Sequence, residues 1–166
     1  MSNLLTLPNI LSLLRLPLAL AFFQGNIPLR IAAIIIAGLT DLLDGFLARR
    51  FGQSSRLGTI LDPLTDKLFV LTALVVFVFE NRLSMPEALT MLSRDFAVVI
   101  FGAYLLLKDA FSLYKIEAIW CGKVFTTLQL FALLSLTLGF SLPGWFYGIF
   151  VMLGVLALVE LKNSEG

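Results

Sequence analysis

The sequence predicts an all-α membrane protein with six transmembrane helices. Of its 166 residues, 59% are hydrophobic and the mean hydropathy is +0.97, which is more apolar surface than a water-soluble domain of this length can bury. A helix that crosses a bilayer needs about 20 mainly apolar residues. Six stretches meet that requirement, at residues 7–23, 28–48, 60–79, 86–107, 119–138 and 143–161.

Polar and turn-forming residues separate the six stretches. Proline stands in or near the first turn of three of them, at Pro28, Pro86 and Pro143. The N–H that proline lacks would have no helical partner at such a position. Pro63 permits two interpretations: it begins the third helix behind a capping Asp62, or it lies within a helix that begins near Gly58. The connections are too short to be domain linkers, so residues 1–166 are expected to form one six-helix domain.

The distribution of basic residues predicts how the helices are oriented. With six spans, both termini lie on the same side as the second and fourth connections. That side carries Arg49, Arg50, Arg56, Lys108, Lys115 and Lys162. The opposite side carries only Arg30 and Arg82. Because positively charged loops stay in the cytoplasm, we expect an inner-membrane protein with both termini in the cytoplasm.

Four aspartates interrupt this apolar sequence, at Asp41, Asp44, Asp62 and Asp66. One aspartate at the centre of a bilayer costs roughly 2.5–3.5 kcal/mol, so four would cost about 10 kcal/mol, which is comparable to the whole stability of a typical domain. A positive partner must therefore hold them. Carboxylate oxygens are the ligands of hard divalent cations.

The spacing of the aspartates brings them together in pairs. Asp41 and Asp44 are three residues apart at the end of the second stretch, and Asp62 and Asp66 are four apart at the start of the third, so each pair shares one helix face. We expect the two helices to be antiparallel neighbours, with all four carboxylates converging at a cytoplasmic, membrane-edge cleft. Such a set suits two ions that clamp the oxygens of a phosphoryl displacement. In the alternative interpretation, the aspartates are interfacial caps and ion-pair partners of nearby arginines.

The remaining composition excludes other kinds of site. The chain has no histidine, which rules out histidine metal ligands, histidine bases and Ser-His-Asp triads. Its one cysteine, Cys121, cannot form an internal disulfide or a thiolate metal site. A net charge of +1 gives no reason to expect a nucleic-acid partner. A transporter would more often show inverted repeats, and none is visible.

The pattern D-x2-D-G-x2-A-R-x8-G-x3-D-x3-D, from Asp41 to Asp66, resembles the signature of the CDP-alcohol phosphatidyltransferases. The Asp frame consists of its eight fixed residues, Asp41, Asp44, Gly45, Ala48, Arg49, Gly58, Asp62 and Asp66. The resemblance implies an integral membrane enzyme that moves a phosphatidyl group from a CDP-linked lipid to an alcohol and releases CMP. We expect this enzyme to form a homodimer.

The resemblance also implies a role for each residue of the Asp frame. All four aspartates would be ligands of two Mg²⁺ or Mn²⁺ ions, and Asp66 would also be the base that deprotonates the acceptor hydroxyl. The CDP group would be held by Gly45, Ala48, Arg49 and Gly58. A carboxylate with an ordinary pKa near 4 is a weak base for a hydroxyl, so the metal must acidify that hydroxyl or stabilise the developing oxyanion.

The acceptor is harder to assign. The opening Leu7-Pro8-Asn9 run and the segment from Gly122 to Gln129 resemble bacterial phosphatidylglycerophosphate synthases, although Phe125 stands where a second lysine is usual and Asp95 where glutamate is usual. Two other segments resemble cardiolipin synthases: Ser93-Arg94-Asp95 and the stretch 38–49. These resemblances leave the acceptor open, and glycerol 3-phosphate is the expected acceptor because its phosphate would pair with cations in the apolar stretches. The alternatives are phosphatidylglycerol, as in a cardiolipin synthase, or the acceptor of another CDP-alcohol phosphatidyltransferase.

Two cations in apolar stretches are candidate acceptor ligands. Arg94 and Lys123 would each be costly in a membrane without a partner, and a phosphate on the acceptor would supply one. In the alternative interpretation, Arg94 pairs with an aspartate of the cluster and Lys123 reaches the interface. Arg15 is expected to extend to the membrane interface rather than bind the acceptor, whereas Asn9 either reaches the cleft or caps the first helix.

Overall fold

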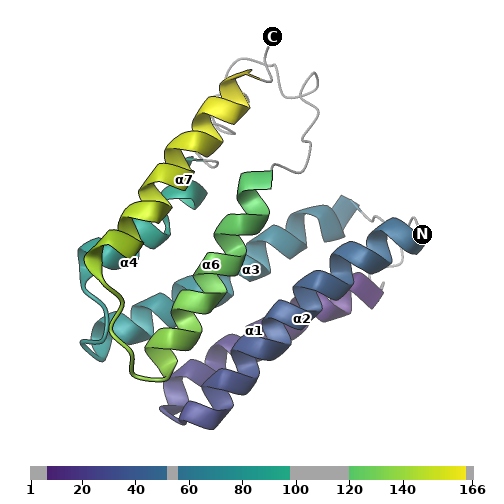
Figure 1. The fold of residues 1–166 in the computed structure, drawn as a ribbon. Coiled ribbons are helices and arrows are strands. Elements are labelled where there is room, and N and C mark those ends of the chain that lie inside the picture. Colours follow the sequence, from purple (N-terminus) through teal and green to yellow (C-terminus); the bar gives the residue numbers. More distant parts are fainter. Residues whose placement is uncertain (1–6, 52–55, 98–119, 164–166) are drawn as a thin grey trace. The chain divides into compact units, whose positions relative to one another are not determined.

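The computed structural model describes residues 7–51, 56–97 and 120–163, and these are all-helical (Figure 1). The helices are α1 (Leu7–Leu20), the 3-10 helix η1 (Ala21–Gln24), α2 (Ile27–Phe51), α3 (Arg56–Phe79), α4 (Met85–Met91), α6 (Trp120–Thr137) and α7 (Gly144–Asn163). The positions of five of the six predicted helical stretches are thereby confirmed. Pro63 lies inside α3, seven residues after its start, so the second interpretation of this proline is the correct one.

The fourth stretch differs from the prediction of one long helix over 86–107. Its start is as expected, because the Ser84 and Glu87 side chains form a capping box and Pro86 stands in the first turn. However, α4 ends after seven residues at Met91, where the N–H of Leu92 bonds to carbonyls in the preceding turn. Residues 93–97 are helical again, and the remainder of the predicted helix lies outside the described residues. Ser93, Arg94 and Asp95 directly follow Leu92, but polar residues do not by themselves end a helix, so the break was not predicted.

The prediction that six helices span a membrane is not confirmed. Within the described ranges, the helices do not combine the length and the hydropathy that a membrane-crossing segment requires. Many large apolar side chains are nevertheless exposed in the middle of these helices. Examples are Ile35, Leu39, Leu71, Val155 and Leu156, of which 43–56% is exposed.

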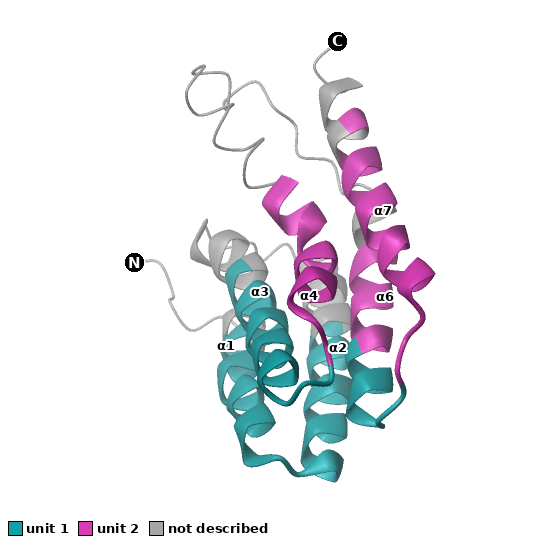
Figure 2. Ribbon diagram, turned by 90° about the vertical axis from the view of Figure 1, so that its left-hand side faces the viewer, with its two compact units in different colours: residues 1–82, 133–140 teal, residues 83–132, 141–166 magenta. Residues whose placement is uncertain are grey.

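The chain divides into two compact units (Figure 2). Unit 1 comprises residues 1–82 and 133–140, and unit 2 comprises residues 83–132 and 141–166. Within unit 1, α1 packs against both α2 and α3. The centre of unit 1 is aromatic, because the ring of Phe22 in η1 meets the rings of Phe69 and Phe77 of α3 edge to face, at centroid distances of 5.6 and 5.8 Å.

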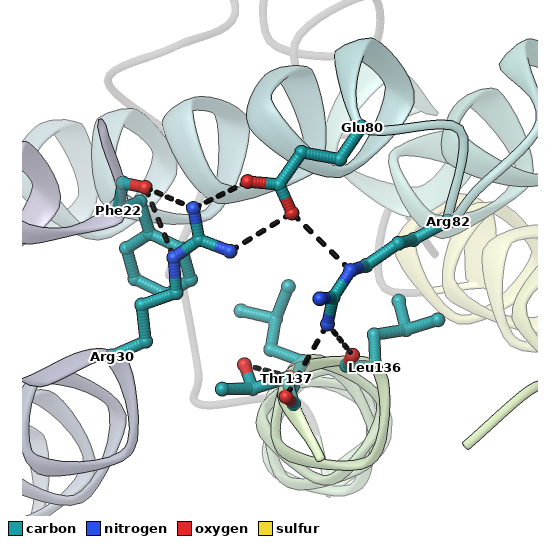
Figure 3. Close-up of polar contacts among 7 residues, drawn as sticks. Phe22, Arg30, Glu80, Arg82, Leu136 and Thr137 are labelled. Atoms are coloured by element: carbon teal, nitrogen blue, oxygen red, sulfur yellow. Dashed lines mark hydrogen bonds and ion pairs between the residues drawn. The ribbon is translucent and has the colours of Figure 1, made fainter. Parts of the chain in front are cut away.

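A buried arginine joins η1, α2 and α3 at one end of unit 1 (Figure 3). Arg30 is 1% exposed. Its Nε and Nη2 atoms donate hydrogen bonds to the carbonyl oxygen of Phe22, and its Nη1 atom donates to the Glu80 carboxylate at 2.9 Å. The same guanidinium lies 5.8 Å from the centroid of the Phe77 ring, within cation–π range. The buried guanidinium of Arg30 therefore contacts a carbonyl oxygen, a carboxylate and an aromatic ring.

The network extends from Glu80 to the end of α6. The Nε atom of Arg82 lies 3.3 Å from the Glu80 carboxylate, and its Nη1 atom donates to the carbonyl oxygens of Leu136 and Thr137 at 3.1 and 3.4 Å. The last carbonyls of a helix have no partner within that helix, and they attract cations. Arg82 thus stabilises the C-terminal end of α6 while it shares Glu80 with Arg30.

In unit 2, α4 packs against α7, and polar side chains connect the end of α4 and Ser93 beyond it to the middle of α6 and α7. The amide of Gln129 in α6 donates to the Met91 carbonyl, and the Ser93 hydroxyl donates to the Phe150 carbonyl, each at 3.0 Å. The rings of Phe125 and Phe150 meet edge to face at 5.2 Å. The packing is close at Gly154, since a Cβ atom there would lie 3.1 Å from the Ser93 hydroxyl oxygen, which would have to shift by a few tenths of an ångström.

We expect the substitution Glu80→Gln to destabilise the protein by about 1.5–3 kcal/mol, the usual contribution of a hydrogen bond to a charged group. The hydrogen bond from Arg30, helped by the charges of Arg30 and Arg82, holds the pKa of Glu80 below its ordinary value of 4.5, against the effect of burial. A lowered carboxyl pKa gives stability that is fully present above the unfolded-state pKa and is lost as the pH falls through the folded-state pKa.

Thermal unfolding of wild type and Glu80→Gln between pH 7 and pH 3 measures this contribution. The difference between the two melting temperatures should be largest at neutral pH and should shrink below about pH 4.5, because other carboxyl groups titrate equally in both proteins. Equal melting temperatures at pH 7 would show that the network adds nothing to stability.

Candidate functional site

The Asp frame lies within two helices of unit 1. Asp41 and Asp44 belong to α2, and Asp62 and Asp66 belong to α3. Each pair of aspartates is therefore on one continuous helix, as its spacing predicts, and shares one face of that helix. In the described part of unit 1, both helices pack against α1, so α1 is the element that links the two halves of the Asp frame.

Asp66 is the only residue of the Asp frame whose side chain is among those described. The side chains of Asp41, Asp44, Ala48, Arg49 and Asp62, and the surroundings of Gly45 and Gly58, lie outside the described residues. Among the side chains that are described, no three potential metal-ligating residues come together. The convergence of four carboxylates therefore stays a prediction. The donor set fits Mg²⁺ or Mn²⁺, because all four aspartates offer hard oxygen ligands.

Asp66 forms an ion pair with Arg15 of α1. The Nη1 atom of Arg15 lies 3.1 Å from the Oδ1 atom of Asp66. The two side chains differ sharply in exposure, since Arg15 is 1% exposed and Asp66 is 37% exposed. The guanidinium thus reaches the carboxylate from the interior of unit 1, while a third of the Asp66 side chain remains accessible.

Arg15 also contacts α2. Its Nε atom donates a hydrogen bond to the hydroxyl oxygen of Thr40 at 3.3 Å, and that hydroxyl donates to the carbonyl of Ala37 at 2.9 Å. Thr40 is buried and directly precedes Asp41 in the chain. Arg15 therefore touches both helices of the Asp frame.

The prediction that Arg15 extends to a membrane interface is wrong. The side chain turns inward because a carboxylate and a hydroxyl lie within its reach, and burial with two polar partners costs less than burial alone. The position of Thr40 next to Asp41 gave no signal in the sequence, since a threonine in an apolar stretch is unremarkable in itself. The signal that was available is Arg15, a charged residue among leucines.

The two candidate acceptor ligands belong to unit 2. The guanidinium of Arg94 lies 5.5 Å from the centroid of the Phe125 ring, and within the described part of the chain its buried Nε atom has no hydrogen-bond acceptor. Lys123 lies in α6, but its side chain is outside the described residues. The proposed role of both residues toward the acceptor stays a prediction.

Comparisons with known proteins agree with the resemblance seen in the Asp frame. A family model described as CDP-alcohol phosphatidyltransferase matches residues 3–159. A CDP-diacylglycerol–glycerol-3-phosphate 3-phosphatidyltransferase of Aquifex aeolicus is 38% identical over 130 residues, which cover 75% of this chain and 70% of the relative. The protein of the same name from Pectobacterium atrosepticum is 36% identical over 140 residues, covering 78% and 75%. A CMP-forming cardiolipin synthase of Streptomyces coelicolor is 30% identical over 181 residues, covering 96% and 84%.

These matches and the all-helical fold define a transferase of phospholipid biosynthesis. The chain belongs to the CDP-alcohol phosphatidyltransferase family. The match extends over α1, α2, α3, α4 and α6 and most of α7. Membership in the family is therefore a property of both units and not of the Asp frame alone.

Proposed function

We propose that this protein transfers the phosphatidyl group of CDP-diacylglycerol to glycerol 3-phosphate and releases CMP. The product is phosphatidylglycerophosphate. The observation that carries this proposal is the Asp frame, complete at all eight positions and distributed over α2 and α3. The two relatives named for the same reaction, at 36% and 38% identity, support the choice of acceptor.

The four aspartates would hold two divalent ions, Mg²⁺ or Mn²⁺. Bound at this site, the ions would neutralise the diphosphate of the donor and acidify the acceptor hydroxyl. Gly45 and Gly58 lack side chains, so a nucleotide or diphosphate can approach the backbone closely there, and Arg49 offers a planar fork for phosphate oxygens. Ala48 completes the set of residues that we assign to the CDP group.

Asp66 would act on the acceptor. Its carboxylate takes the proton of the glycerol 3-phosphate hydroxyl as the hydroxyl oxygen attacks the lipid-side phosphorus of CDP-diacylglycerol. A P–O bond forms to the acceptor oxygen, and the P–O bond to the phosphate of CMP breaks, so CMP leaves with the electron pair. The exposure of a third of the Asp66 side chain supports this role, since the base must reach the hydroxyl of a diffusing acceptor.

Arg94 and Lys123 would bind the phosphate of the acceptor. The buried Nε atom of Arg94 has no acceptor within the described part of the chain, and a buried donor of this kind favours the binding of an oxyanion. The packing of its guanidinium against the Phe125 ring would hold the remaining nitrogens in place. Phe125 occupies the position of the second lysine expected in such enzymes, so an aromatic contact would replace a charge there.

A cardiolipin synthase is the second candidate. The relative of that name from Streptomyces coelicolor aligns with 96% of this chain, although at lower identity than the synthases named for glycerol 3-phosphate. Its acceptor would be phosphatidylglycerol, whose free hydroxyls lie on a glycerol headgroup without a terminal phosphate. The two candidates share the metal site and the chemistry and differ in the acceptor alone.

We also propose that the enzyme is an integral protein of the cytoplasmic membrane, with its termini and the Asp frame on the cytoplasmic side, and that it forms a homodimer. Its donor is a lipid, so the site must open to a bilayer. The exposure of large apolar side chains in the middle of α2, α3 and α7 supports a hydrocarbon environment. The orientation rests on the bias of basic residues toward one side.

The proposed metal site predicts a complete dependence on divalent ions. Excess EDTA should abolish CMP release, and Mg²⁺ or Mn²⁺ should restore it.

The substitution Asp44→Asn should weaken binding of both Mn²⁺ and CDP-diacylglycerol. Asp66→Asn should retain donor binding and should lose about 10²–10⁴-fold in kcat, the usual contribution of a general base. Full activity in EDTA would contradict the metal site, and loss of donor binding in Asp66→Asn would contradict the role of that residue.

The acceptor is tested by turnover of purified protein with glycerol 3-phosphate and with phosphatidylglycerol. We expect turnover with glycerol 3-phosphate only. Arg94→Ala should raise KM for glycerol 3-phosphate roughly 10–150-fold, as expected for loss of one ion-paired contact, while KM for CDP-diacylglycerol changes far less. Arg82→Ala removes an arginine that contacts Glu80 and α6 and should leave both constants unchanged. Turnover with phosphatidylglycerol alone would reject the proposed acceptor.

The proposed orientation is tested by cysteine labelling in a Cys121→Ala background. A cysteine at Ser54, between α2 and α3, should react with a membrane-impermeant maleimide only after the cells are permeabilised. A cysteine at Gln24, which is exposed between α1 and α2, should react in intact cells because it lies on the opposite side. The reverse pattern would invert the orientation.

A further inference from the structure

Arg15 needs an explanation that the proposed chemistry does not give. It is 1% exposed, and a buried guanidinium loses more solvation than an ordinary structural contact returns. A leucine or methionine at this position would fill the same space without that cost. Arg15 must therefore do something that an apolar side chain cannot do.

Arg15 contacts both helices that carry the Asp frame, α2 and α3. On α3 its partner is Asp66, the last acidic residue of the frame, at 3.1 Å. On α2 its partner is Thr40, at 3.3 Å, one residue before Asp41, the first acidic residue of the frame. One side chain of α1 thus connects the two helices at the points where the frame begins and ends.

The contact with Thr40 restricts the orientation of the Arg15 guanidinium. The Thr40 hydroxyl donates its proton to the Ala37 carbonyl at 2.9 Å, so its lone pairs are left for the Nε atom of Arg15. The hydrogen bond from Nε orients the guanidinium, and its charge attracts the Asp66 carboxylate across a 3.1 Å ion pair in which the Nη1 atom forms no hydrogen bond to any described residue. Because Arg15 is buried and Asp66 is 37% exposed, the carboxylate is held from its inner side.

The other buried arginine of unit 1 provides a comparison. Arg30 is equally buried at 1% and also pairs with a carboxylate, that of Glu80. Its second partner is the Phe22 carbonyl, and neither partner belongs to the Asp frame. Arg30 ties helix ends together, whereas Arg15 joins the residues beside and within the proposed metal site.

We infer that Arg15 is a positioning residue of the Asp frame, which holds Asp66 and the α2 segment at Asp41 in the arrangement that binds the divalent ions. This inference rests on the proposed metal site. Ion-binding carboxylates depend on such supporting contacts, whose loss typically costs 10–100-fold in metal affinity or activity. Arg15 itself touches neither the substrates nor, in this assignment, the ions.

The test is a titration of the full-length protein with Mn²⁺, followed by electron paramagnetic resonance without substrates. Arg15→Met should raise the Kd for Mn²⁺ roughly 10–100-fold and lower kcat, with a smaller change in KM for CDP-diacylglycerol. The sign of the effect is decisive. Removal of a positive charge near a cation site should by itself tighten Mn²⁺ binding, so weaker binding identifies positioning. Arg15→Lys, which keeps the charge but not the fork, should recover part of the affinity.

Arg30→Met is the matched control, because it removes an equally buried arginine of the same unit. It should lower the melting temperature and leave the Kd for Mn²⁺ unchanged. If Arg15→Met does not fold, the pair Thr40→Val and Thr40→Ser decides the question. Valine keeps the shape of Thr40 and loses the bond to Arg15, so it should weaken Mn²⁺ binding, whereas serine keeps the hydroxyl and should match wild type.

The outcomes separate this inference from the proposed function. Unchanged or tighter Mn²⁺ binding in Arg15→Met, or equal affinities for Thr40→Val and Thr40→Ser where Arg15→Met does not fold, would overturn the positioning role while the metal site stands. A wild-type protein that neither binds Mn²⁺ nor needs it for turnover would overturn the proposed metal site itself, and with it the inference.

Discussion

The packing of unit 1 depends on the need to give partners to two buried arginines. Arg15 and Arg30 are each 1% exposed in an otherwise apolar set of helices. A buried charge without a partner is among the most costly defects that a fold can contain, so α1, α2 and α3 must pack where a carboxylate, a hydroxyl or a helix-end carbonyl meets each guanidinium. Apolar side chains tolerate many arrangements, and the two ionic contacts limit them in different places: Arg30 where η1 and the ends of α2 and α3 meet, and Arg15 beside the Asp frame.

Much of the fold follows from apolar length and turn residues. The sequence located α1, α2, α3, α6 and α7 to within a few residues, because their breaks contain glycine, asparagine or charged residues. It missed the end of α4 at Met91, since neither glycine nor proline marks the turn at Leu92. The prediction that the helices span a membrane differs from the prediction of their positions, because it concerns the surroundings of the helices. Composition predicted it, and the described helices do not confirm it.

The Asp frame could be predicted because its chemistry fixes its spacing. Helical periodicity places each aspartate pair on one face, and the structure contains both pairs in continuous helices. The supporting residues could not be predicted in the same way. Arg15 and Thr40, for example, are twenty-five residues apart, and their contact depends on how α1 and α2 cross. A local sequence pattern does not predict how two helices cross. The acceptor is open for a related reason, because it depends on side chains from several helices and not on one motif.

The Arg30–Glu80 contact has a consequence for the order in which the chain is assembled. The two residues are fifty positions apart, so Arg30 is synthesised long before its carboxylate partner. During that interval, the described contacts available to Arg30 are those with Phe22, eight residues earlier, whose carbonyl accepts hydrogen bonds from Arg30 and whose ring lies 5.9 Å from its guanidinium. α2 therefore carries an uncompensated cation until α3 is complete, and it cannot settle in its final place before then. Unit 1 should mature as a set of three helices in one step, with the end of α6 added through Arg82 when that helix emerges.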